Sequence, residues 1–184
     1  MNRPATAADS LAVMISSTSL DLPQHREAVN EAIRRVEWRP LAMEHGSAEA
    51  GSDALSYSLA MADKADLYIG ILALRYGYVP ADPGGNPGGW SVTEHEYRRA
   101  KQRGIPILIY LMHDDHPVTR KDFEASEAAQ KKLEALKDEL KKNHICAFFR
   151  SADELKALVI QSLNEAKAKR AAPREAVRAG VFQA

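Results

Sequence analysis

Residues 66–74, DLYIGILAL, form the strongest strand signal in the chain, because they are rich in Leu, Ile and Tyr. Before them, residues 54–65 predict a helix with Leu55, Leu59 and Met61 facing inward. After them, residues 80–89 are dense in Pro and Gly and predict a surface loop. The order helix, strand, long loop indicates that this strand is not part of a hairpin.

The same alternation continues outward in both directions. Residues 11–16, LAVMIS, predict a strand buried on both faces, and Pro40 weakens a second strand at 38–43. Further strands are expected at 105–112 and 145–149. One helix is expected after the first strand, with Ser19 or Asp21 as its cap and Pro23 in its first turn. A second is expected to begin at a Ser91 or Thr93 cap and to end at Arg103-Gly104. Two more are expected at 124–143 and 152–168. The segments at 44–53 and 113–122 predict polar loops.

Alternating strands and helices predict βαβ units, which give a parallel sheet with right-handed crossovers. We expect an α/β, flavodoxin-like three-layer sandwich whose five-stranded parallel sheet has the order 2-1-3-4-5. Ligands bind such sheets at the carboxyl edge, where the strand order reverses. This selects the loops after Ile15, Leu74 and Met112 as the place of any site.

The bulk composition is that of one globular domain. The chain has 184 residues, 45% hydrophobic and 27% charged, and its 25 basic residues balance 25 acidic ones. Zero net charge gives no attraction to nucleic acid or anionic lipid, so neither partner is favoured. Residues 1–10 lack the apolar core of a signal peptide and every apolar run is shorter than a membrane span, so we expect a soluble, cytoplasmic protein.

The expected domain covers residues 10–168. Residues 1–9 are expected to be a flexible N-terminus, and residues 169–184, rich in Ala, Arg and Pro, a flexible tail or linker. The single cysteine, Cys146, excludes an internal disulfide and is expected in a buried strand. His113-Asp114-Asp115-His116 lacks a defined ligand spacing, so no metal site is expected there.

Two of the selected loops carry candidate binding residues. Ser16, Ser17 and Thr18 follow the first strand, where hydroxyls and backbone N–H groups can hold a phosphate or ribose, although helix capping explains them equally well. Arg75, Tyr76 and Gly77 follow the third strand, where a guanidinium can pair with a phosphate and an aromatic ring can stack on a base. Neither a GxGxxG nor a GxxxxGK[ST] motif occurs.

The third candidate segment opens the helix after the Gly-rich loop with Trp90, Ser91, Glu94 and Glu96. Residues two apart on a helix point about 200° apart, so the two carboxylates cannot face one pocket. We expect Glu96 to face inward, because it shares a face with the small Ala100, and Glu94 to be solvated; the reverse assignment remains the alternative.

Four segments, in the same order, resemble the DUF4062 domain family. They are VMISSTSLDLPQHREAVNEAI, DKADLYIGILALRYGY, SVTEHEYRRAKQRGIPILIY and HICAFFRSADELKALVIQSL, and together they span roughly residues 10 to 166. DUF4062 domains are similar to TIR domains and, more distantly, to nucleoside deoxyribosyltransferases. DUF4062 domains often precede an NTPase or repeat region, so this resemblance implies a fused or associated module of that kind.

The resemblance also implies a chemistry. In enzymatic TIR domains a glutamate on the helix after the third strand helps to break the nicotinamide–ribose bond of NAD. Matching the Glu-hydrophobic pattern selects Glu96, whereas counting from tryptophan in the TIR pattern W-x-x-x-E selects Trp90 and Glu94. The expected activity is cleavage of NAD or a related nucleotide in defence or stress signalling, with NAD as substrate and no cofactor. The alternative is a non-catalytic module that self-associates or senses a nucleotide.

Overall fold

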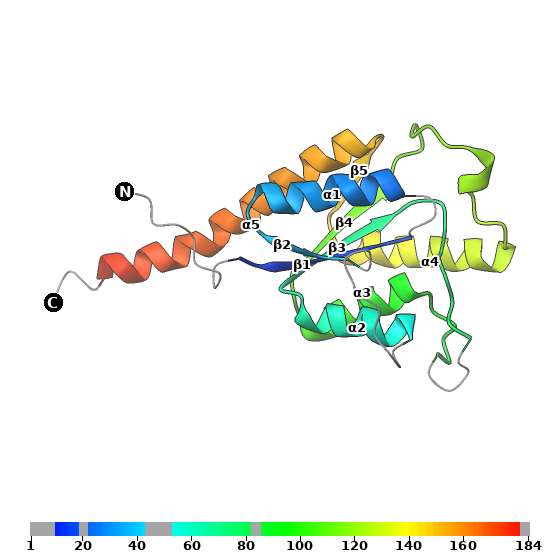
Figure 1. Cartoon of the computed structure of the whole chain (residues 1–184), viewed down its shortest axis with the longest axis horizontal. Coiled ribbons are helices and arrows are strands. Elements are labelled where there is room, and N and C mark those ends of the chain that lie inside the picture. Colours follow the sequence, from blue (N-terminus) through cyan, green and yellow to red (C-terminus); the bar gives the residue numbers. More distant parts are fainter. Residues whose placement is uncertain (1–9, 19–21, 43–52, 82–85, 181–184) are drawn as a thin grey trace.

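The computed structural model describes residues 10–18, 22–42, 53–81 and 86–180. Five strands and five α-helices alternate along these residues (Figure 1). The strands are β1 (Ala12–Ser17), β2 (Arg39–Leu41), β3 (Leu67–Leu72), β4 (Ile107–Met112) and β5 (Cys146–Phe149). The helices are α1 (Pro23–Arg35), α2 (Ala54–Lys64), α3 (Val92–Arg103), α4 (Glu127–Asn143) and α5 (Ala152–Gly180), with a short 3-10 turn at Arg120–Asp122.

The strands form one parallel sheet with the order β2-β1-β3-β4-β5, so the predicted flavodoxin-like topology is confirmed. All six residues of β3 are buried, as expected for the central strand of a sheet covered on both faces. Ile69 pairs with Ile15 of β1 on one side and with Leu108 of β4 on the other. The strand order reverses between β1 and β3, which places the crevice for ligands at their carboxyl ends.

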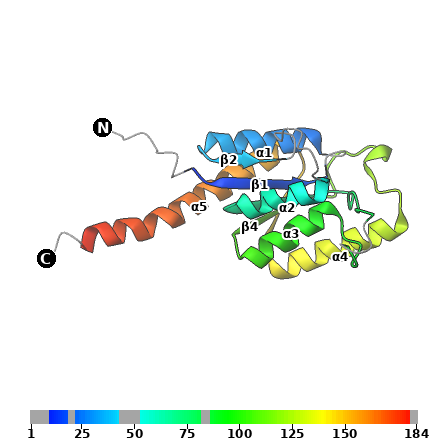
Figure 2. The same ribbon diagram turned by 60° about the horizontal axis from the view of Figure 1, so that its bottom comes forward.

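Helices cover both faces of the sheet and create two cores. One face carries α1 and α5, and the opposite face carries α2, α3 and α4 (Figures 1 and 2). Val29 and Ile33 of α1 meet Leu155 and Val159 of α5 in the first core. The second core contains three leucines of α4, Leu133, Leu136 and Leu140.

Some element ends differ from the sequence expectation. Helix α1 has Leu22 as its N-cap, with no side-chain cap and Pro23 in the first turn; Ser19 and Asp21 lie outside the described residues. Helix α5 continues past the expected end at Ala168 to Gly180, through a segment rich in Ala and Arg that also contains Pro173. Pro40 lies within β2, an edge strand of the sheet, where proline is tolerated. Cys146 is half-buried rather than buried.

No helix among the described residues is both long and apolar enough to cross a membrane.

Candidate functional site

Glu96 of α3 lies in a buried cage of hydroxyl groups beside the carboxyl half of β1. Only 4% of the residue is exposed. Ser16 of β1 donates a hydrogen bond to one carboxylate oxygen, and Ser58 of α2 donates to the other. Three elements that are distant in sequence therefore converge on this carboxylate, as the preference for Glu96 as the inward residue predicted.

Tyr68 of β3 closes the cage from the sheet. Its side chain is almost completely buried, and it lies within hydrogen-bonding reach of Ser16. Burial, and after it the charge of Glu96, raises the pKa of the Tyr68 phenol well above its ordinary value. The phenol is therefore a permanent donor beside Glu96 at physiological pH.

Glu94 is not solvated, and that expectation is wrong. It is 5% exposed and accepts hydrogen bonds from the Tyr76 hydroxyl and from Arg98, with 2.6 Å from Arg98 Nη2 to Oε1. Arg98 also packs 4.2 Å from the ring centroid of Trp90, a cation–π contact that helps to hold the ion pair. The two carboxylates point in different directions, as the helical spacing predicted, and both are buried.

A small cavity of about 160 Å³ adjoins Glu94. Trp90, Arg98 and Lys132 line it, whereas Glu96 does not. Lys132 of α4 donates to the carbonyl of Gly88 at 3.2 Å, and so joins α4 to the Gly-rich loop. The cavity is open to solvent, and Glu94 faces two cations across it, Arg98 and Lys132.

Asn86 organises the described end of the Gly-rich loop. Its side chain accepts from the Trp90 N–H at 2.8 Å and donates to the Trp90 carbonyl at 2.9 Å. Ser91 then begins α3 as its N-cap, and its hydroxyl accepts from the Glu94 N–H at 3.2 Å. This confirms Ser91, not Thr93, as the cap and fixes the first helical turn that carries both glutamates.

Gly77 brings the loops after β1 and β3 together. Its φ of 92° lies in the left-handed region, and a Cβ atom there would meet the Thr18 methyl at 3.0 Å and the Thr93 hydroxyl at 3.7 Å. Thr18, Gly77 and the start of α3 are therefore neighbours, as the topology predicted. Arg75 is half-buried in the same loop.

Ser17 is held by a residue that the sequence argument did not single out. Arg26 of α1, 7% exposed, donates to the Ser17 hydroxyl at 2.8 Å and to its carbonyl at 3.1 Å. The guanidinium thus fixes the end of β1.

A histidine pair connects α1 with the loop after β4. His25 Nε2 lies 2.9 Å from His116 Nε2, and His116 Nδ1 donates to the Pro117 carbonyl at 2.8 Å. A neutral His116 therefore accepts at Nε2 from His25. Burial first, and the neighbouring His116 second, lower the pKa of His25 to about 4. Within the described part of the chain, no group of three or more metal-ligating side chains is present.

Sequence reasoning missed Ser58, Tyr68, Arg26 and Arg98. Ser58 was hidden because the inward face of α2 was assigned from Leu55 and Leu59, which are only half-buried. Tyr68 was read as a strand residue alone. The spacing of Arg98, four residues after Glu94 on a helix, was a signal that could have predicted the ion pair.

Comparisons with known proteins add one firm result. No curated protein matches the sequence significantly. The solved structure of a CMP N-glycosidase from Clostridium botulinum, BcmB, is similar at 14% identity and a TM-score of 0.43, over 80% of this chain and 96% of that one; a likeness this distant says nothing about activity. A family model described as a domain of unknown function, DUF4062, matches residues 12–164. Because that match spans most of the chain, the protein belongs to the DUF4062 family.

Proposed function

We propose that this domain cleaves the N-glycosidic bond of a nucleotide, with NAD as the first substrate to test. The observation that carries the proposal is the Glu96 carboxylate, buried near the carboxyl end of β1 and held by two neutral hydroxyls. Cleavage of an N-glycosidic bond passes through an oxocarbenium-like state, whose positive charge a nearby carboxylate stabilises. Burial strengthens this stabilisation because little water screens the charge.

Glu96 suits this role better than Glu94. Arg98 pairs directly with Glu94 and offsets its negative charge, so less of that charge is available to an oxocarbenium ion. Ser16 and Ser58, which donate to Glu96, are uncharged. The ribose hydroxyls of a substrate offer the same donor chemistry, so they can take the place of these serine hydroxyls on the carboxylate.

The remaining roles follow from position. Ser17, fixed by Arg26, and Thr18 lie where a phosphate or ribose would meet the loop after β1. Arg75, Tyr76 and Gly77 would orient the nucleotide from the loop after β3, and Trp90 and Ser91 would bound it from α3.

The deciding experiment is release of nicotinamide from NAD, and of free base from other nucleotides, by concentrated protein over hours. Glu96→Gln should abolish release, whereas Glu94→Gln should leave most of it. The matched control is Glu134→Gln on the exposed face of α4, where Glu134 pairs with Lys137. If release is lost in Glu94→Gln alone, Glu94 is the catalytic carboxylate. If no nucleotide is cleaved, even with a crowding agent that favours assembly, the proposal is wrong.

One observation favours a non-catalytic interaction module as the second candidate. Tyr78 is 67% exposed and neighbours the partly exposed Val79 in the loop after β3. Such apolar residues in a loop can form a contact with a second copy or with another module, such as a fused NTPase. Sedimentation velocity of the wild type and of Tyr78→Asp tests this: concentration-dependent association that the substitution abolishes would support the module.

A further inference from the structure

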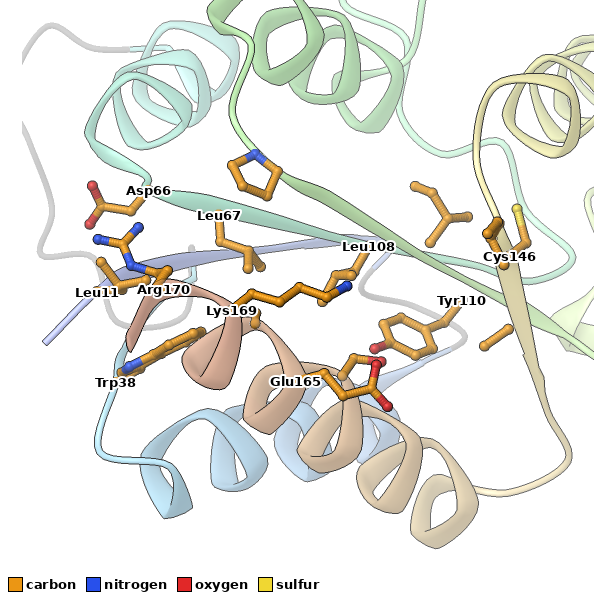
Figure 3. A pocket seen from close by; sticks show the side chains of 16 residues that line it. Leu11, Trp38, Asp66, Leu67, Leu108, Tyr110, Cys146, Glu165, Lys169 and Arg170 are labelled. Carbon is orange, nitrogen blue, oxygen red and sulfur yellow. The ribbon is translucent and has the colours of Figure 1, made fainter. Parts of the chain in front are cut away.

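A second cavity lies at the amino edge of the sheet, opposite the candidate site. Its volume is about 480 Å³, within the range of about 300–1,000 Å³ in which proteins bind small molecules. The amino ends of β1, β3, β4 and β5 form one wall, and the middle of α5, from Ser162 to Arg170, forms the other (Figure 3). Ser16, Ser58 and Arg98, which donate to the two glutamates, do not line this cavity.

The floor of the cavity is apolar and incompletely covered. Leu11, Leu108, Ala147 and Ala166 pack against the core between the sheet and α5, yet all four remain partly exposed. Figure 3 shows Leu108 and Leu67 at the sheet with α5 on the other side of the space. When a ligand covers an apolar surface of this kind and displaces water from it, the free energy of the complex is lowered.

One buried polar group is directed into this space. Tyr110 is 1% exposed, and within the described part of the chain its hydroxyl has no well-aligned hydrogen bond, although Ser162 and Glu165 lie close to it. Burial raises the pKa of this hydroxyl to about 12, so it stays protonated and can donate or accept. A buried hydroxyl without a well-aligned partner destabilises the folded chain. A ligand group that forms this hydrogen bond would remove that cost.

Charges surround the cavity in equal numbers. Asp66 and Glu165 supply two carboxylates, and Lys169 and Arg170 supply two cations. Glu165 lies close to Tyr110 (Figure 3). Because the four charges sum to zero, a ligand with net charge gains no overall attraction at this edge.

We propose that the cavity binds a neutral small molecule with an apolar, ring-containing body and one hydroxyl or carbonyl group that hydrogen-bonds to Tyr110. The site is separate from the candidate glycosidase site and does not depend on it. A ligand there would lie between α5 and the amino edge of the sheet, and so would bind only the folded chain.

The test measures binding of N-phenyl-1-naphthylamine by fluorescence, followed by displacement with naphthalene, 2-naphthol and 2-naphthoate. We expect saturable binding of one probe per chain, and at least tenfold weaker binding in Ala166→Phe, which fills the cavity. The control Ala128→Phe, on the exposed side of α4, should bind as the wild type does. Should Ala166→Phe unfold, Ala147→Phe fills the same space from β5.

The polar contact is tested by comparing the competitors. A hydrogen bond to Tyr110 should make 2-naphthol bind about 2- to 10-fold more tightly than naphthalene, and Tyr110→Phe should remove that preference. Unsaturable binding, equal binding in the filled variants, a naphthol preference that survives in Tyr110→Phe, or tighter binding of the anion 2-naphthoate would each overturn the proposal.

Discussion

Glu94 and Glu96 are two residues apart, and each has a different electrostatic environment. Glu96 contacts two serine hydroxyls, whereas Glu94 contacts a tyrosine hydroxyl and a guanidinium. Helical periodicity predicted that they diverge. The burial of both could not be predicted. It depends on Tyr76 and Ser58, which belong to other parts of the chain and contact the two glutamates only once the chain has folded.

Ser58→Ala should destabilise the fold by about 1–3 kcal/mol, because one oxygen of the buried Glu96 carboxylate loses its hydrogen bond. Urea denaturation followed by circular dichroism measures this. Ser56→Ala is the control on the same helix: Ser56 is exposed, and its hydroxyl donates to the N-cap Asp53 at 2.9 Å. Because water can replace that exposed hydrogen bond, its loss should cost less than the loss of the buried one. Equal costs for the two variants would show that Ser58 does not support Glu96.

From the lowered pKa of His25 we expect the free energy of unfolding to decrease in mild acid. Its pKa is lowered to about 4 in the folded chain from 6.5 in the unfolded chain, so between these values the unfolded chain binds more protons. Stability should therefore fall as the pH drops from 6.5 toward 4 and level off below, by about 1–2 kcal/mol after allowance for solvent screening.

The His25→Gln variant isolates this effect. It removes the titrating group while keeping a side-chain donor, so its urea midpoint should change less between pH 7 and pH 4.5 than that of the wild type. His116→Gln should raise the pKa of His25, since the neighbouring imidazole contributes to lowering it. An identical pH profile in wild type and His25→Gln would refute the assignment.

At the scale of elements, the strands were predictable and several helix ends were not. Apolar runs such as residues 66–74 specify buried strands, and β3 has every residue buried. Gly104 was correctly predicted to end α3, because glycine adopts the left-handed conformation that ends helices. The N-cap Leu22 was missed because leucine has no side-chain oxygen to cap a helix. The extension of α5 was missed because Pro173, which normally interrupts a helix, lies within it.

Gly104→Ala should destabilise the chain by about 1 kcal/mol, and Gly104→Asn by less. The φ of Gly104 is 66°, and an added Cβ would meet no atom within 4 Å, so only the backbone conformation opposes alanine. Asparagine tolerates that conformation better. Thermal unfolding of the two variants measures the difference; an alanine variant as stable as the wild type would contradict this account.

At the scale of the whole molecule, the sheet separates two kinds of surface. The carboxyl edge gathers the buried carboxylates and the loops that the topology selected, whereas the amino edge holds an apolar cavity beside α5. The sequence predicted the first edge because strand order determines where loops meet. It could not predict the second, because the cavity depends on how far α5 stands from β4 and β5.

The domain boundary expected near residue 168 leads to the last prediction. The fully buried side chains among the described residues of α5 are Leu155, Val159 and Leu163, all in its first half. The second half projects past the amino edge of the sheet (Figures 1 and 2).

A chain ending at Arg170 keeps these leucines and valine, the cavity lining, and the Lys167 bond to the Val36 carbonyl. It should therefore unfold cooperatively with a free energy of unfolding within about 1 kcal/mol of the full chain. Helix content by circular dichroism should fall by the removed turns alone. A larger loss of stability would place residues 171–184 within the folding unit and move the boundary to the C-terminus.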